Sequence, residues 1–250
     1  MQKIIYFTLI LLIKSSFQQL PINECNTRRS NTFCQIMQYN ETHPRFMPVS
    51  NIPNKEVQSV NLVGYLGARM HTMTSDLCDA FPNIEIFNAD FLGLEKVEEN
   101  AFDNCKKLER LYFSRNKLQD DDLKPGLFKN NLKLRSLLLE GNQFKKLDLT
   151  VFNNLQKLEE LRLYRNELEQ FELKDLTPLK KLDSLYLEYN QLPDVDEKEI
   201  LVKFPNLKEI SLCNNAKINS ARLKNLKDFF KAKNVTMKCL NDDKFNAEYN

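Results

Sequence analysis

Hydrophobic and polar positions along the middle of the chain follow a pattern that returns every 24 to 26 residues. Four segments carry apolar residues at positions one, four, six and eleven and asparagine at position nine: LERLYFSRNKL from Leu108, LRSLLLEGNQF from Leu134, LEELRLYRNEL from Leu158 and LDSLYLEYNQL from Leu182. Less regular copies begin at Val57, Ile84 and Leu207. A repeat of this length predicts a solenoid in which each copy forms one turn.

Each turn should contain one short strand. In the copy from Leu158, Leu161 and Leu163 alternate with polar residues as a strand with one buried face requires, while Leu158 and Leu168 lie in the flanking turns and face the core. Stacking the turns then predicts a parallel sheet. Asparagine at position nine falls where the chain bends away from the strand, and its amide can pair with buried backbone groups. We therefore predict a structural ladder of Asn116, Asn142, Asn166 and Asn190.

The opposite side of each turn has its own register, three and six residues before each starting residue. The residues six before are Cys78, Phe102, Phe128, Phe152, Leu176 and Leu201; those three before are Phe81, Cys105, Asn131, Leu155, Leu179 and Phe204. These columns are expected in the core. Cys78 and Cys105 replace inward residues in adjacent columns of adjacent turns, close enough for a disulfide.

The repeats resemble those of extracellular leucine-rich repeat proteins over residues 57–215, which makes about six to seven repeats. The resemblance implies an α/β fold: a curved right-handed coil with a parallel sheet on its concave face, an irregular or short-helical convex side, and cysteine-stapled caps at both ends. The chain is similar to Toll-like receptor ectodomains and to small secreted leucine-rich proteins of invertebrate innate immunity. Tyr65 and Leu92 depart from the asparagine column, and no known ligand-site residue carries over.

Caps are expected because the end turns of a solenoid expose its interior. Residues 20–56 form the predicted N-terminal cap, and residues 216–240 form the predicted C-terminal cap. In the first, Cys25 and Cys34 resemble a smaller version of the disulfide-bonded cap that precedes extracellular repeats. In the second, Ser220 is predicted to cap a helix, VTMKC to add a last strand, and Cys213 to bond Cys239. Six cysteines allow 15 complete pairings, so this set is one choice among them.

The first residues indicate secretion. Residues 1–19 have a lysine near their start, Lys3, followed by an apolar run too short to span a membrane, which is typical of a signal peptide; a buried N-terminal helix is the alternative. Six cysteines agree with an oxidising compartment. Asn40 and Asn234 begin glycosylation sequons, the second hindered by its cap, although either match could arise by chance. Residues 241–250 are expected to form a flexible tail, and no membrane insertion is expected after signal cleavage.

Composition argues against several functions. The formal charge is only +2 with both signs interspersed, which gives no case for nucleic acid binding. The two histidines, His43 and His71, have no ligand or nucleophile nearby in sequence, so we predict no metal, no cofactor and no catalytic residue. No phosphate loop or nucleophile elbow is present, and the chain is predicted not to be an enzyme.

Binding should use the strand residues that face away from the core, which fall in columns across the sheet. The first column is Ile86, Arg110, Ser136, Glu160, Ser184 and Glu209; the second is Asn88, Tyr112, Leu138, Arg162, Tyr186 and Ser211; the third is Asp90, Ser114, Glu140, Tyr164, Glu188 and Cys213. Just beyond lie Arg115, Gly141, Arg165, Tyr189 and Asn214. Tyrosine and arginine carry much of the binding energy at protein interfaces. The predicted ligand patch is Tyr112, Arg162, Tyr164, Arg165, Tyr186, Glu188 and Tyr189.

The sequence thus predicts a secreted, non-enzymatic protein that binds an extracellular protein or other ligand through its concave face, in keeping with a role in innate immunity. Two alternatives stay open. Tyrosine also suits strands, and Arg162 and Glu188 could be an ordinary ion pair. A matrix or adhesion scaffold without a dedicated patch would share the same fold, and self-association into homo-oligomers has no sequence signature.

Overall fold

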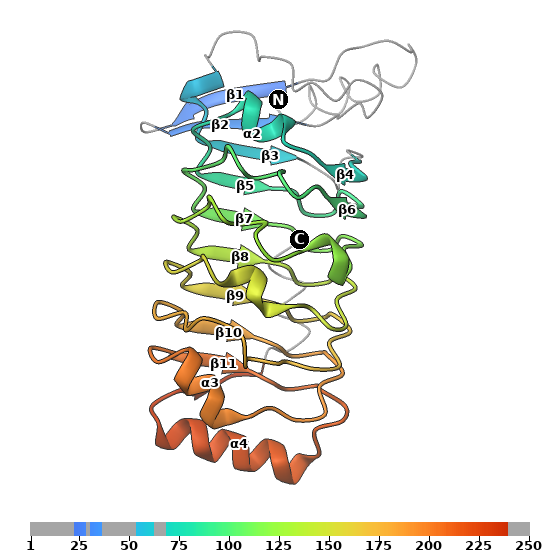
Figure 1. Ribbon diagram of the computed structural model, residues 1–250, viewed down its shortest axis with the longest axis vertical. Helices are drawn as coiled ribbons and strands as arrows, with labels where there is room; N and C mark the ends of the chain where they lie inside the picture. The colour runs from blue at the N-terminus through green and yellow to red at the C-terminus, as the bar shows by residue number, and fades with distance from the viewer. Residues whose placement is uncertain (1–22, 29–30, 37–53, 63–68, 240–250) are drawn as a thin grey trace, which may run out of the picture.

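The computed structural model describes residues 23–28, 31–36, 54–62 and 69–239. One sheet runs the length of the solenoid in the order β1-β2-β3-β5-β7-β8-β9-β10-β11-β12 (Figure 1). All neighbouring pairs are parallel except β1 and β2. The strands are β1 Asn23–Arg28, β2 Asn31–Ile36, β3 Ser59–Leu62, β5 Ile86–Asn88, β7 Arg110–Tyr112, β8 Ser136–Leu138, β9 Glu160–Arg162, β10 Ser184–Tyr186, β11 Glu209–Ser211 and β12 Thr236–Met237.

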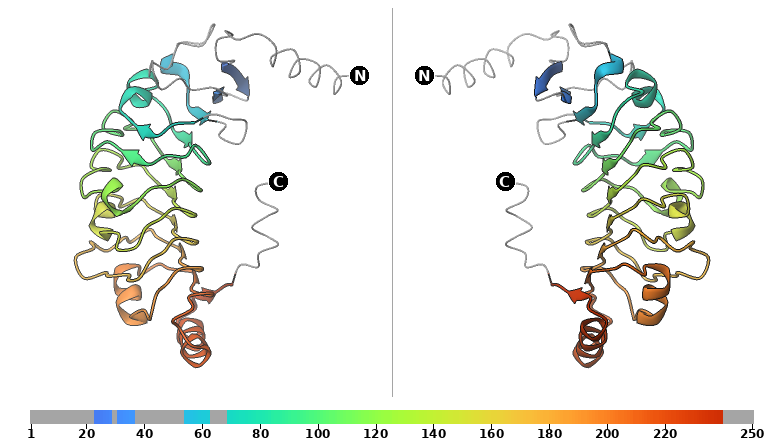
Figure 2. Two further views of the ribbon diagram at one scale, coloured as in Figure 1. Left: turned by 90° about the vertical axis from the view of Figure 1, so that its right-hand side faces the viewer. Right: turned by 90° about the vertical axis from the view of Figure 1, so that its left-hand side faces the viewer.

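The solenoid is curved, with the long sheet on its concave side and short helical segments on its convex side (Figure 2). A second, two-stranded parallel sheet pairs β4 with β6. The remaining elements are β4 Thr72–Met73, β6 Lys96–Val97, α2 Asp76–Ala80, α3 Glu197–Lys203, α4 Ser220–Ala232, and the 3-10 helices η2 Asn54–Glu56, η4 Asp120–Asp122 and η5 Leu149–Phe152. This is the leucine-rich repeat architecture that the sequence predicts.

The strands are short because each supplies only one inward residue between two that face the concave side. Leu161 of β9 and Leu185 of β10 are buried, and the residues on either side of each are half-buried. Phenylalanines fill the interior behind them: the Phe102 ring centroid lies 5.7 Å from that of Phe113 and 5.6 Å from that of Phe128. Aromatic contact of this kind adds to the burial of apolar area.

The asparagines at position nine form a buried ladder. Asn166 is typical: its side-chain amide donates to the carbonyls of Leu163 (2.9 Å) and Leu139 (3.1 Å), and its Oδ1 accepts from the Phe144 N–H (3.3 Å). Each asparagine therefore ties its own turn to the preceding one. Asn116, Asn142 and Asn190 make the same contacts, and so does Asn215, a fifth member beyond the four that were predicted.

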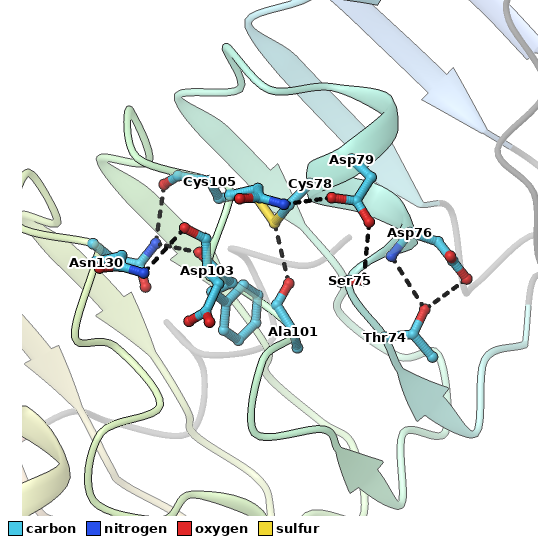
Figure 3. The surroundings of a disulfide bond; sticks show 12 residues. Thr74, Ser75, Asp76, Cys78, Asp79, Ala101, Asp103, Cys105 and Asn130 are labelled. Carbon is cyan, nitrogen blue, oxygen red and sulfur yellow. Dashed lines mark hydrogen bonds between the residues drawn. A yellow bond between two sulfur atoms is a disulfide. The ribbon is translucent and has the colours of Figure 1, made fainter.

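A disulfide joins Cys78 in α2 to Cys105 in the next turn, with 5.0 Å between their Cα atoms (Figure 3). These are the two cysteines that the column positions pair. Beside them the Ser75 hydroxyl donates to Asp79 Oδ2 at 3.0 Å. The covalent bond therefore holds α2 against the following turn at the N-terminal part of the solenoid.

At the C-terminal end, α4 covers the last turn with Leu226 and Phe230, both fully buried. The prediction that Ser220 caps this helix is wrong. Asn219 has extended backbone angles and its side chain accepts from the Arg222 N–H at 2.9 Å, so Asn219 is the N-cap and Ser220 is the first helical residue. The Arg222 guanidinium bridges Asp194 (2.8 Å) and Glu197 (2.6 Å) of the preceding turn.

The last strand, β12, pairs in parallel with β11. A disulfide joins Cys213 to Cys239 with 5.5 Å between Cα atoms, the second pairing that the sequence suggests. Asn234 follows α4 with a φ of 60° and an exposed side chain, which removes the expected steric hindrance at this sequon. Its glycosylation stays a prediction.

At the other end, β1 and β2 form an antiparallel hairpin in which the backbone of Cys25 lies opposite that of Cys34. The proposed bond between them concerns side chains outside the described part of the chain. The same holds for the signal peptide at 1–19, for Asn40, for Tyr65 and for the tail at 241–250.

Candidate ligand-binding face

Two columns of the concave face are organised around Arg162 and Tyr186. The Arg162 Nε donates to Glu160 Oε1 at 2.7 Å, and its guanidinium carbon lies 5.5 Å from the centroid of the Tyr186 ring. The Tyr186 hydroxyl donates to Glu209 Oε1 at 2.8 Å. The 2.7 Å ion pair of Arg162 is therefore formed with Glu160 of its own strand. The alternative drawn from the sequence names Glu188 as the partner.

These contacts fix both side chains. Burial disfavours the charge of Arg162, but attraction to Glu160 outweighs it and raises the pKa of the guanidinium. Burial and the hydrogen bond to Glu209 raise the pKa of the Tyr186 phenol well above its ordinary value. At every pH near neutrality this part of the face presents a charged arginine beside a neutral tyrosine.

Every member of the third column except Asp90 is buried, which corrects two of the predicted binding residues. Tyr164 is 1% exposed and Glu188 is 0% exposed, so neither can touch a ligand on this face. Their neighbours Ser114 and Glu140 are equally buried, and the Tyr164 hydroxyl lies 3.5 Å from Oε1 of Glu140, which follows strand β8. The alternation of a strand would direct these side chains outward, whereas in the structure they are covered.

We call this third column the floor, because it lies beneath the concave face and carries mainly carboxyl and hydroxyl groups. Asp90 Oδ1 accepts from the Ser114 N–H at 2.6 Å, yet burial and the nearby Glu140 raise the pKa of Asp90 to about 7. Burial also raises the pKa of Glu188, against the opposing effect of Arg162. The fold thus holds carboxyl groups in the floor whose charged forms are disfavoured.

A fourth column lies at the edge of the face and has an unusual backbone. Every member takes a positive φ: Phe91 61°, Arg115 55°, Gly141 70°, Arg165 53°, Tyr189 55° and Asn214 59°. This left-handed conformation disfavours side chains with a Cβ and suits glycine or asparagine. Bulky residues nevertheless occupy four of these six positions. Strained backbone of this kind persists only where the surrounding structure over-determines it, and it clusters at functional sites.

We name this column the rim. Its arginines stack on its aromatic rings: the Arg115 guanidinium carbon lies 4.8 Å from the Phe91 centroid, and that of Arg165 lies 4.5 Å from the Tyr189 centroid. Gly141 separates the two pairs, and a Cβ there would lie 3.1 Å from Arg115 Cγ. The stacking orients each guanidinium before any partner arrives, which lowers the entropic cost of binding.

The exposed part of the predicted patch is therefore Tyr112, Arg162, Arg165, Tyr186 and Tyr189, all half-buried. The structure adds Arg115 and Phe91, which are not among the predicted binding residues. Phe91 belongs to the degenerate repeat from Ile84, whose leucine in the asparagine position hides its register. Both residues occupy position eight of their repeats, directly before the asparagine position, and that recurring position is the sequence signal for them.

Relief of backbone strain gives a direct test of the rim. Tyr189→Gly is expected to be more stable than Tyr189→Ala by about 1 kcal/mol, because glycine adopts a φ of 55° without the Cβ clash. Urea denaturation of both variants measures the difference. As a control, glycine should be the less stable of the pair at Tyr186, which lies in regular strand β10. Equal stability of the two Tyr189 variants would contradict the assigned backbone.

Within the described ranges, no group of three or more histidine, cysteine, aspartate or glutamate side chains is arranged to hold a metal ion. No helix of these ranges is long and apolar enough to cross a membrane.

Comparison with known proteins agrees with the geometry. The leucine rich repeat family matches residues 82–144 and 132–192. Among solved structures, the LRIM1/APL1C complex matches with a TM-score of 0.55 and 22% sequence identity, over 79% of this chain and 35% of the matched chain. The leucine-rich repeat domain of APL1B matches with a TM-score of 0.47 and 29% identity, over 55% of this chain and 40% of the other. This chain thus spans well under half of each matched chain. No curated protein matches the sequence.

Proposed function

Since this chain is a leucine-rich repeat protein, we propose that it is a secreted, non-enzymatic binding protein that recognises an extracellular protein through its concave face. The rim carries the proposal. Arginine and aromatic side chains occupy left-handed positions there at a cost of about 1 kcal/mol each, and this cost is understandable if those side chains contact a partner.

The composition of the face supports a protein partner. Tyr112, Tyr186 and Tyr189 lie beside Arg162 and Arg165 on a surface with a preorganised network, and tyrosine and arginine dominate the binding energy of protein interfaces. The matched LRIM1/APL1C structure is itself a complex of two proteins. A role in innate immunity rests on the resemblance of the repeats to immune leucine-rich proteins.

The two cysteine pairs Cys78–Cys105 and Cys213–Cys239 support an oxidising, extracellular location. The apolar N-terminal segment at 1–19 also supports secretion, because it has the features of a signal peptide. Removal of that segment in the mature protein can be checked by N-terminal sequencing of protein recovered from culture medium.

Binding through the concave face is tested with partners captured from the extracellular fluid of the source organism. Each captured protein is then titrated against purified wild type, Tyr186→Ala and Tyr189→Gly, the second of which keeps a relaxed backbone. We expect each variant to weaken a true partner at least about tenfold, as truncation of an interface tyrosine does. The variant Lys157→Ala, at an exposed turn residue outside the strand columns, is the control and should bind as the wild type does.

Unchanged affinity in both tyrosine variants, with circular dichroism showing folded protein, would reject the concave face. Loss of binding in Lys157→Ala alone would point to a surface outside the strand columns, as expected of a scaffold without a dedicated patch.

A further inference from the structure

The two disulfides in the described part of the chain differ in their access to solvent. Cys78 and Cys105 are both 0% exposed in the core, whereas Cys213 is 5% exposed and Cys239 is an exposed residue. A disulfide is reduced when a thiolate attacks one of its sulfur atoms, so the rate depends on access to that sulfur. The C-terminal bond can therefore be attacked at Cys239, and the bond in the core is protected.

The accessible bond holds the last strand of the long sheet. β12 lies beside α4 (Figure 2) and, among the described strands, pairs only with β11. The Thr236 N–H donates to the Lys208 carbonyl at 2.7 Å, and the Lys238 N–H donates to the Ile210 carbonyl at 2.9 Å. Of the two residues in this strand only Met237 is buried. A strand so short, paired on one edge, has low local stability, and the covalent bond next to it compensates for this.

The helix that precedes this strand is held independently of the bond. α4 buries Leu226 and Phe230 against the last turn, and its Arg222 forms ion pairs with the preceding turn. The Val235 N–H donates to the Phe230 carbonyl at 2.9 Å, which fixes the chain up to the start of β12. Loss of the bond should therefore free the chain from Thr236 onward and leave α4 and the repeats in place.

The same strand is connected to the concave face through Lys238. Its ammonium group pairs with Oε2 of Glu209 on β11, while Oε1 of Glu209 accepts from the Tyr186 hydroxyl at 2.8 Å. The Tyr186 ring in turn lies against the Arg162 guanidinium. Release of β12 would take the cation away from Glu209, so a change at the disulfide reaches the side chains of the concave face.

We propose that Cys213–Cys239 is a site of thiol–disulfide exchange, at which a dithiol reductant opens the C-terminal end of the sheet while the rest of the solenoid stays folded. One thiolate of the reductant attacks Sγ of Cys239, forms a mixed disulfide and expels the Cys213 thiolate. The second thiolate of the reductant then attacks the sulfur of the reductant in the mixed disulfide and expels the Cys239 thiolate. The protein gains two electrons and, from the two thiols of the reductant, two protons; the reductant leaves as a disulfide. This reaction does not depend on which ligand the concave face binds.

The first test follows the cysteines of the purified full chain under native conditions. The protein is incubated with dithiothreitol, samples are alkylated with N-ethylmaleimide over time, and peptide mass spectrometry measures the labelling of each cysteine separately. Cys213 and Cys239 are expected to be labelled together, at least about tenfold faster than Cys78 and Cys105. In concentrated urea, where burial is lost, the difference should disappear. Equal native rates, or faster labelling of Cys78 and Cys105, would overturn the proposal.

Hydrogen–deuterium exchange then tests whether reduction opens the sheet. In the selectively reduced protein the amides of Thr236 and Lys238 are expected to exchange at least about tenfold faster than in the oxidised protein, because their acceptors on and beside β11 are lost. The amides of α4 and β9 are the internal controls and should exchange at unchanged rates. The double variant Cys213→Ser with Cys239→Ser should show the same pattern without any reductant.

Two exchange results would contradict the proposal even if the labelling is selective. Unchanged exchange in β12 would mean that the bond is reduced without opening the sheet. Faster exchange throughout the repeats would mean that the bond is needed for the whole fold and does not act on the C-terminal end alone.

Discussion

Replacing Asn166 with alanine is expected to lower the free energy of unfolding by about 3 kcal/mol. The substitution removes two donated hydrogen bonds, to the Leu163 and Leu139 carbonyls, and one accepted from the Phe144 N–H. All three backbone groups belong to a buried region that water does not reach, and each unpaired buried polar group costs about 1 to 3 kcal/mol. The cavity left by the amide adds to the loss.

Chemical denaturation followed by circular dichroism measures this change. The matched control is the same substitution at Asn154, which is exposed and should alter stability by less than about 0.5 kcal/mol. If Asn166→Ala loses less than about 1 kcal/mol, the ladder does not hold the turns together in the way its hydrogen bonds indicate.

Asp90→Asn is expected to stabilise the protein above neutral pH. Burial, the charge of Glu140 and the opposing effects of Ser114 and Arg115 leave the pKa of Asp90 at about 7, against a value of 3.8 for a free carboxyl. Between these two values the folded state keeps a proton that the unfolded state has released. The free energy of unfolding therefore falls as pH rises from about 4 to 7, and the lost stability does not return at higher pH.

Asparagine cannot ionise, and its Oδ1 can still accept from the Ser114 N–H. Since Asp90 retains partial exposure, we expect the variant to exceed the wild type by about 2 kcal/mol at pH 8 and to match it at pH 4. Urea denaturation at pH 4, 6 and 8 follows the difference, with exposed Asp175→Asn as the control. A difference that stays constant with pH, or a wild type more stable at pH 8, would be inconsistent with a raised pKa of the Asp90 carboxyl.

The repeat pattern predicts most of the fold, because the spacing of its residues follows directly from how they pack. Leucines at positions four and six must be buried in every turn, and the asparagine must pair with backbone, so their spacing alone predicts turn, strand and ladder. The column positions of Cys78 and Cys105 were informative for the same reason, since adjacent inward positions lie within disulfide distance.

The binding face was harder to predict because its burial depends on backbone angles. Tyr164 and Glu188 alternate with leucines as exposed strand residues do, and nothing in their identity indicates that the next residue turns left-handed. Arginine and tyrosine are poor predictors of a positive φ, so the rim at Arg165 and Tyr189 could not be assigned from propensity. The same limit applies to Asn219 and Ser220, two good capping residues that only the local φ and ψ angles separate.

The closure of the C-terminal end by α4 has a consequence for how such a protein can change in length. Because α4 buries Leu226 and Phe230 and is clamped to the preceding turn through Arg222, a new turn cannot be added beyond it without losing the cap. Interior turns contact only their neighbours. Duplication of an internal repeat, such as the one from Leu158, would keep both ends intact and insert one more strand, lengthening the receptive surface by about 4.8 Å per copy. Gene duplication within the solenoid is thus the route by which this architecture can fit partners of different size.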